Sequence, residues 1–139
     1  MRQKVFVDTN FFCALYNPTD SLYQSAQVIR KHVVNWDLIV SNFILLETYT
    51  ILSQRVSKHF AIQFGQKLLT EHPYIIIWVD KKLEESVWNI FASVSNKNFS
   101  YVDASILAVM QKEYIHHLLS FDRQFVKLQK KFHFTLLGI

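Results

Sequence analysis

Short apolar runs alternate with longer amphipathic segments along this chain of 139 residues. The short runs are rich in β-branched and aromatic residues, which predicts strands at residues 4–7, 38–40, 74–79, 117–120 and 134–137. In the longer segments, apolar residues recur every three or four positions, which is typical of helices. The predicted helices cover residues 21–33, 42–56, 58–70, 81–94, 101–114 and 123–130.

Polar side chains stand at the predicted starts of four of these helices. Asp20, Ser41, Asp80 and Ser100 each precede an amphipathic segment, where a side-chain oxygen can accept hydrogen bonds from free backbone N–H groups. Strands that alternate with helices predict a parallel sheet covered by helices on both faces. The chain has only two glycines and two prolines and no repeat or linker. We therefore predict one α/β domain over residues 1–139, with a central parallel sheet of about five strands.

Four acidic residues are placed where such a sheet binds its ligands, outside the carboxyl ends of the strands. Asp8 ends the first strand and Asp122 follows the fourth, while Glu47 and Asp103 lie on the helices after the second and third strands. If the second and third strands lie on one side of the first, and the fourth on the other, Asp8 and Asp122 become neighbours. All four carboxylates can then converge above the first strand.

The surroundings of these four acids point to a divalent cation. The segments VFVD, ILLE, YVDASI and LLSFD place each carboxylate beside large apolar residues, whereas most other acids look like solvated surface charges. Carboxylates held together repel one another and raise one another's pKa values unless a cation neutralises them. A donor set of oxygens without cysteine suits Mg²⁺ or Mn²⁺ better than Zn²⁺.

Each acid also has a purely structural alternative. Asp8 could cap a short helix over FFCALY, and Asp103 could satisfy the N-terminus of its own helix. Asp122 could lie in a turn after the fourth strand, and Glu47 could pair with a lysine of a neighbouring helix. Convergence of all four is harder to explain by structure alone than any one position.

Composition and charge indicate the cellular compartment and the kind of ligand. Half of the residues are hydrophobic, and the only cysteine, Cys13, excludes an intramolecular disulfide, so we predict a cytoplasmic protein without a membrane segment. The formal net charge is +4. If four of the 11 acids bind metal, 15 basic side chains face only seven remaining acids on the surface. An acidic pocket in a basic surface fits a nuclease that uses metal.

The four acidic segments, in this order, are similar to those of the PIN-domain ribonucleases, and particularly of the VapC-type toxins of toxin–antitoxin pairs. The matching segments are FVDTNFF, SNFILLE, SYVDASI and SFDRQF, which together span most of the chain. The resemblance implies a single PIN-like domain that hydrolyses RNA with Mg²⁺ or Mn²⁺, forms a homodimer and is silenced by a small antitoxin. The residues that it implies for catalysis and metal binding are Asp8, Glu47, Asp103 and Asp122, with Thr9, Asn10 and Ser100 as supporting polar groups.

One position departs from the family pattern. Some relatives carry a further acid shortly after the fourth one, where this chain has Gln124. The choice between one and two metal ions therefore stays open. In the mechanism that we expect, an ion held mainly by Asp8 and Asp122 activates water, and a second ion at Glu47 or Asp103 stabilises the leaving oxygen.

Basic residues near the acids are candidates for contact with RNA phosphates. Arg55 lies eight residues after Glu47 on nearly the same helix face, and Arg123 and Lys127 follow Asp122. The alternative for all three is an ordinary solvated surface.

Three other functions share parts of this pattern. A phosphorelay receiver would need an acid beside Asp8, a phosphoacceptor at Asp80 and a lysine after the last strand, but Asp80 looks like an N-cap and LLGI carries no lysine. A PIN-like module that binds RNA or protein without cutting would not need all four acids. A structure-specific DNA nuclease usually carries extra helices, for which 139 residues leave little room.

Overall fold

The computed structural model describes residues 2–71 and 73–139, so Met1 and His72 of the predicted domain lie outside the described residues. The strands are β1 Lys4–Val7, β2 Asp37–Ser41, β3 Tyr74–Ile77, β4 His117–Leu119 and β5 Thr135–Leu137. The helices are α1 Thr9–Tyr16, α2 Tyr23–His32, α3 Asn42–Arg55, α4 Lys58–Glu71, α5 Lys81–Ser93, α6 Tyr101–Lys112 and α7 Gln129–Phe132, with a 3₁₀ helix η1 over Arg123–Leu128. No helix in this part of the chain is both long and apolar enough to cross a membrane.

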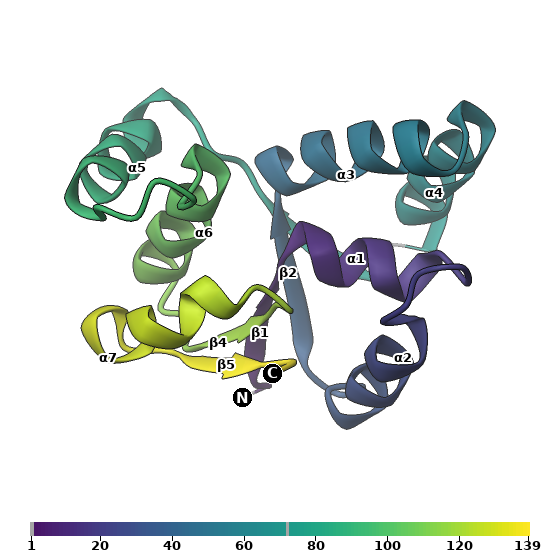
Figure 1. The fold of residues 1–139 in the computed structure, drawn as a ribbon, viewed down its shortest axis with the longest axis horizontal. Coiled ribbons are helices and arrows are strands. Elements are labelled where there is room, and N and C mark those ends of the chain that lie inside the picture. Colours follow the sequence, from purple (N-terminus) through teal and green to yellow (C-terminus); the bar gives the residue numbers. More distant parts are fainter. Residues whose placement is uncertain (1, 72) are drawn as a thin grey trace.

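The five strands form one parallel sheet in the order β3-β2-β1-β4-β5. This confirms the predicted α/β class and the predicted position of β1 between β2 and β4. Figure 1 shows α5 and α6 on one side of the sheet and α1 to α4 on the other. Val7 pairs with Leu119, so the residues that follow them, Asp8 and Ser120, leave the sheet side by side.

Burial explains why the central strands read as unbroken apolar runs. Val5, Phe6 and Val7 of β1 are buried, because helices cover both faces of a parallel sheet. The edge strand β3 is different, since Ile75 and Ile76 are about half exposed, at 46% and 47%. The core therefore lies over β1, β2 and β4, and the carboxyl ends of these strands carry the predicted site.

Several predicted boundaries differ from the structure by one or two residues, and three differences change how a segment is held. The third strand ends at Ile77 instead of residue 79, because the Asn42 side chain accepts the Val79 N–H at 2.7 Å and takes it out of the sheet. The second helix begins at Tyr23 and Asp20 is not its N-cap; Asp20 Oδ1 accepts the Leu22 N–H in the preceding turn instead. The predicted helix over residues 123–130 is a 3₁₀ helix through Leu128 followed by the single α-helical turn of α7.

The last strand and the residue after it support the end of β4. The Ser120 N–H donates to the Leu137 carbonyl oxygen at 3.0 Å. Gly138 has a φ of +121°, which side-chain-bearing residues rarely adopt. A Cβ atom at Gly138 would lie 2.5 Å from the Ser120 carbonyl oxygen. Only glycine therefore allows the chain to pass this closely behind Ser120.

We expect Gly138→Ala to destabilise the fold by about 1–3 kcal/mol, because it combines backbone strain with a clash against Ser120. The matched control is Gly65→Ala, where the added Cβ meets only the Tyr49 ring at 3.3 Å inside a helix that favours alanine. We expect the control to change stability by less than about 1 kcal/mol. Urea unfolding of both variants measures this, and equal stability of the two would contradict the prediction.

Candidate active site

The four predicted acids line a single open pocket at the carboxyl edge of the sheet. Its volume is about 370 Å³, and it lies between the ends of β1 and β4, α3 and the start of α6. Among its lining residues are four acids, two polar residues and one cation that the sequence singled out: Asp8, Glu47, Asp103, Asp122, Thr9, Asn10 and Arg55. The topology therefore brings together residues that lie more than 100 positions apart.

Asp8 is the most deeply buried of the four acids, at 5% exposure. Its Oδ1 accepts the Thr9 N–H at 2.7 Å, and its Oδ2 accepts the Ser120 hydroxyl at 2.7 Å. Burial raises the pKa of Asp8 to about 7, and the charges of Asp103 and Glu47 add to the rise, while the two hydrogen bonds oppose it. Asp8 does cap α1, as the structural alternative required, and it also faces the pocket.

Ser120 connects two of the acids by hydrogen bonds, and the sequence pattern did not predict this role. It is fully buried, and its Oγ accepts the Asp122 N–H at 3.0 Å in addition to donating to Asp8. Asn10 reinforces this link, since its Nδ2 donates to Ser120 Oγ at 3.4 Å and its Oδ1 accepts the Phe121 N–H at 3.1 Å. The available signal was a serine directly after an apolar strand and two residues before Asp122.

Asp103 is held by the start of its own helix. Ser100 Oγ accepts the Asp103 N–H at 3.0 Å, and Asp103 Oδ2 accepts the Ser100 N–H at 2.9 Å, which forms a capping box. Ser100 therefore lies behind Asp103 and does not line the pocket. Burial raises the pKa of Asp103, and the neighbouring charges of Asp122 and Glu47 raise it further.

Glu47 and Asp122 differ in how they are held. The Glu47 carboxylate has neither a hydrogen bond nor an ion pair with any described residue, so the predicted alternative of a lysine partner is not seen. Asp122 caps η1 through its Oδ1, which accepts the Gln124 N–H at 3.0 Å, and its Oδ2 accepts Gln124 Nε2 at 2.7 Å. Of the four predicted acids, one thus has a free carboxylate and three are fixed by hydrogen bonds; Asp20, bonded to the Leu22 N–H, is a fifth acid in the lining.

The three basic residues predicted to contact RNA are placed differently. Arg55, in the last turn of α3, is the only Lys or Arg among the described residues that lines the pocket. Arg123 and Lys127 lie exposed on η1, next to Asp122 but outside the pocket wall. Arg55 therefore has the most direct access to a phosphate group lying over the acids.

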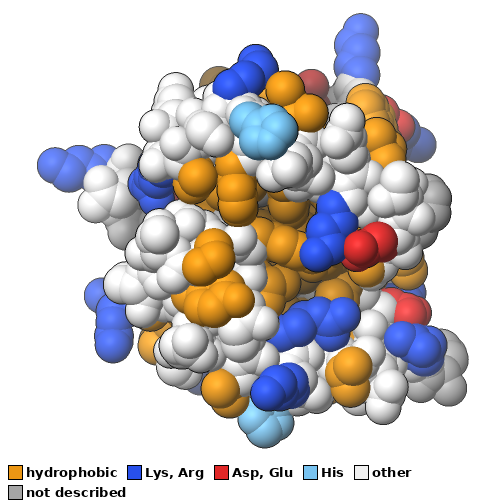
Figure 2. Space-filling view, turned by 90° about the vertical axis from the view of Figure 1, so that its right-hand side faces the viewer, with side chains coloured by type: hydrophobic (Ala, Val, Ile, Leu, Met, Phe, Trp, Pro, Cys, Tyr) orange, Lys and Arg blue, Asp and Glu red, His pale blue; other side chains and the backbone are white. Residues whose placement is uncertain are grey.

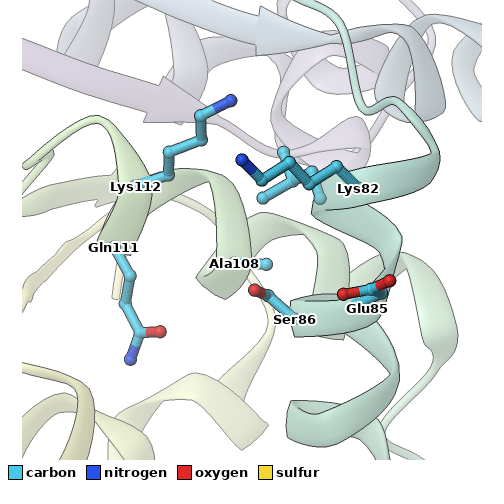
Figure 3. A pocket seen from close by; sticks show the side chains of 7 residues that line it. Lys82, Glu85, Ser86, Ala108, Gln111 and Lys112 are labelled. Atoms are coloured by element: carbon cyan, nitrogen blue, oxygen red, sulfur yellow. The ribbon is translucent and has the colours of Figure 1, made fainter.

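A second and larger pocket, of about 490 Å³, lies between α5 and α6 (Figure 3). In Figure 3, Lys82 and Lys112 point into the same opening, while Glu85 lies on the α5 side. None of the predicted site residues lines this pocket, and its only acid is Glu85. Size alone would not have selected the acidic pocket, because this cavity and two others, of about 540 and 580 Å³, are larger.

The donor set of the acidic pocket fits a hard divalent cation. Within residues 2–71 and 73–139, no group of three or more His, Cys, Asp or Glu side chains is arranged so that it could hold a metal ion. Mg²⁺ does not require three protein ligands, because it keeps several waters and commonly takes one or two carboxylates. Burial raises the pKa of Asp8, so the protein compensates the charge of this carboxylate poorly. One or two of Asp8, Asp103, Asp122 and Glu47 are therefore the residues that could hold such an ion.

The raised pKa of Asp8 predicts a stability that depends on pH. Between pH values of about 4 and 7 the folded protein retains a proton that the unfolded chain has released, so stability should fall as the pH rises through this window. Asp8→Asn cannot ionise and should lose this slope, which makes it more stable than the wild type by about 1–4 kcal/mol near pH 8 in EDTA. Urea unfolding at several pH values measures the slopes. Glu85→Gln, far from the pocket, should keep the wild-type slope; the same slope in Asp8→Asn would contradict the prediction.

Comparisons with known proteins give the same family as the acidic segments. A model of the PIN domain matches residues 5–131. The chain is 32% identical over 129 residues to the 23S rRNA-specific endonuclease VapC20 of Mycobacterium tuberculosis, a match that covers 87% of this chain and 91% of VapC20.

Solved structures agree with the sequence match. The crystal structure of VapC20, a sarcin-ricin loop cleaving toxin, superimposes with a TM-score of 0.81 at 29% identity and covers 89% of this chain and 94% of VapC20. Two more distant structures share the fold, each over at least 96% of both chains. They are FitAcB from Neisseria gonorrhoeae (TM-score 0.71, 12% identity) and VapBC2 from Rickettsia felis bound to a DNA fragment from their promoter (0.68, 17%). The chain therefore belongs to the PIN-domain family and is a homologue of VapC20.

Proposed function

We propose that this protein is a metal-dependent endoribonuclease and the toxin of a toxin–antitoxin pair. The observation that carries the proposal is the convergence of Asp8, Glu47, Asp103 and Asp122 in one pocket of a chain homologous to VapC20. RNA is the proposed substrate. The sarcin-ricin loop, which VapC20 cleaves, is the first RNA to test.

Mg²⁺ or Mn²⁺ is the proposed cofactor. When bound, such an ion lowers the pKa of a coordinated water and stabilises negative charge on a phosphate. The protein's own part is to fix the carboxylates: the Thr9 N–H and the Ser120 hydroxyl orient Asp8, and the capping box with Ser100 orients Asp103.

Apart from its carboxylates, the pocket offers no side-chain base for a metal-free reaction. Among the described residues no His or Lys lines it, and burial raises the pKa of the Cys13 thiol to about 11, so this thiol stays protonated. Carboxylates are left as the functional groups, with Arg55 positioned to bind a phosphate oxygen. This composition favours metal-assisted hydrolysis over nucleophilic catalysis by the protein.

The other proposed functions are less well supported. A receiver domain would use Asp80 as its phosphoacceptor, but Asp80 Oδ1 accepts the Leu83 N–H at 2.9 Å as the N-cap of α5. A PIN-like module that only binds RNA or protein would keep the fold and lack cleavage, so it is the alternative that the activity experiment must separate.

A protein partner is the second part of the proposal. Figure 2 shows hydrophobic side chains gathered in a hollow on the side of the molecule where α2 and α4 lie, with Lys and Arg around it. An apolar groove between α3 and α4 is lined by Tyr49, Ile62 and Leu69, of which Ile62 and Leu69 are exposed to 48% and 69%. Exposed apolar surface of this kind favours association. A small antitoxin is the proposed partner, and a homodimer would use surface of the same kind.

We expect Asp8→Asn to fold and to lose cleavage. The purified protein is incubated with total cellular RNA in Mg²⁺, Mn²⁺ or EDTA, beside Asp8→Asn and the surface control Glu85→Gln. Discrete fragments that require metal and Asp8, and that persist in Glu85→Gln, are the expected result, with at least a ~100-fold loss in Asp8→Asn. Full activity in Asp8→Asn would overturn the site assignment, and no cleavage by any variant would favour the binding module.

We expect Ile62→Glu to weaken the complex with the antitoxin while RNA cleavage by the free protein is unchanged. A charged side chain in the groove between α3 and α4 cannot be desolvated against an apolar partner without a free-energy penalty. The candidate antitoxin is the product of the reading frame next to this gene, co-expressed and co-purified with each variant. Gln63→Glu adds the same charge one position further along α4 as a control. Equal recovery of the partner with both variants would place the antitoxin elsewhere.

A further inference from the structure

Gln124 joins two of the four acids through one amide group. Its Nε2 donates to Asp122 Oδ2 at 2.7 Å and to Asp103 Oδ2 at 2.9 Å. Its backbone N–H also donates to Asp122 Oδ1 at 3.0 Å. Asp103 comes from α6 and Asp122 from the end of β4, so Gln124 connects two elements that the sheet alone does not fix to each other.

The orientation of this amide follows from its surroundings. The Gln124 Oε1 atom is buried and has no hydrogen-bond partner among the described residues. The reverse orientation would direct this oxygen at two carboxylate oxygens, which accept and do not donate when ionised. The NH₂ group must therefore face the acids, although a buried acceptor is left unpaired.

An NH₂ group shared by two carboxylates has the geometry of a bridging cation without its charge. Two carboxylates close enough to share one donor repel each other, and both a bridging metal ion and a bridging donor reduce this repulsion. The donor is part of the chain, so it is present at every metal concentration. It also engages one oxygen of each carboxylate, Asp103 Oδ2 and Asp122 Oδ2.

Other carboxylate oxygens of the pocket are not bound to Gln124. Asp8 is held by Thr9 and Ser120 and has no hydrogen bond with Gln124. Asp103 Oδ1 and the Glu47 carboxylate accept no hydrogen bond from any described residue. The pocket thus contains both carboxylate oxygens that the amide already bridges and oxygens that are free to bind a ligand.

We propose that Gln124 is a positioning residue whose side-chain amide takes the place of a second divalent cation between Asp103 and Asp122, so that this protein takes up a single ion. The inference rests on the proposed function, because it assumes that the pocket binds a divalent cation. The sequence left the choice between one and two ions open at this position, and the role proposed for Gln124 favours one. In this property the chain would differ from relatives that carry an acid at the same position.

Isosteric replacement of the amide tests this role. Gln124→Glu keeps the shape but turns a donor into a carboxylate, whereas Gln124→Met keeps the length and removes the donor without adding a ligand. Gln63→Glu on the exposed surface of α4 adds the same charge away from the pocket. Calorimetric titration with Mn²⁺ gives the number of ions per chain, and electron paramagnetic resonance of the same samples reports whether two Mn²⁺ ions are magnetically coupled.

We expect one Mn²⁺ in the wild type and in Gln63→Glu, and two coupled ions in Gln124→Glu. Gln124→Met should gain a second ion that binds at least ~10-fold more weakly than the first, because Asp103 and Asp122 lose their shared donor without gaining a ligand. A purely space-filling role for Gln124 would leave the number of ions unchanged in both variants.

The outcomes separate this inference from the proposed function. Two ions in the wild type, or one ion in both Gln124 variants, would overturn the inference and leave metal dependence intact. If no protein in the series binds Mn²⁺, the proposed metal-dependent function falls together with the inference. Should Gln124→Glu fail to fold, the Gln124→Met titration still decides.

Discussion

A carboxylate buried at the centre of the sheet edge is the constraint on which this structure depends. Asp8 follows the most central strand and is removed from water, where an uncompensated charge is costly. The Thr9 N–H and the Ser120 hydroxyl reduce this penalty but leave the pKa near 7. Without a ligand, Asp8 can avoid the buried charge by holding a proton near neutral pH; the proposed cation would supply the missing compensation and keep Asp8 ionised.

The other acids are placed by local features that the fold would need in any case. Asp103 completes a capping box at the start of α6, and Asp122 caps η1. Each carboxylate is therefore fixed by the backbone groups of its own helix, and the parallel sheet brings those helix starts to one edge. Glu47 is the exception, because no described residue holds its side chain. A side chain without fixed partners can adapt to a ligand, whereas the three fixed ones define where the ligand lies.

The sequence was sufficient for the fold and for the convergence of the four acids in one pocket, because both follow from regular patterns. Alternating strands and helices predict the parallel sheet, and the carboxyl ends of its strands predict where Asp8 and Asp122 meet. The start of the second helix at Tyr23 was not predictable, since Asp20 is a good capping residue that hydrogen-bonds within a turn instead. The early end of the third strand was not predictable for a similar reason. The Val79 N–H donates to the side chain of Asn42, which is distant in the sequence.

The finer parts of the site depend on side-chain contacts between distant elements, which the sequence pattern does not reveal. Ser120 resembles any serine at the end of a strand, and its importance comes from the register that places it beside Asp8. Gln124 was visible only as a departure from the family pattern. Its contacts with Asp103 and Asp122 depend on the 3₁₀ geometry of η1, which replaces the regular helix that the sequence predicted. Side-chain bridges between distant elements leave no periodic signal.

The position of Gly138 behind Ser120 also bears on how the protein is made. The ribosome synthesises β5 and Gly138 after every other element described. The loop that contains Ser120 and Asp122 nevertheless packs against them and hydrogen-bonds to β5. Parallel strands cannot pair before the later one has emerged, so a nascent chain carries its acids before it has an ordered pocket. Translation order therefore delays the formation of an ordered acidic pocket until the last strand of the sheet has left the ribosome.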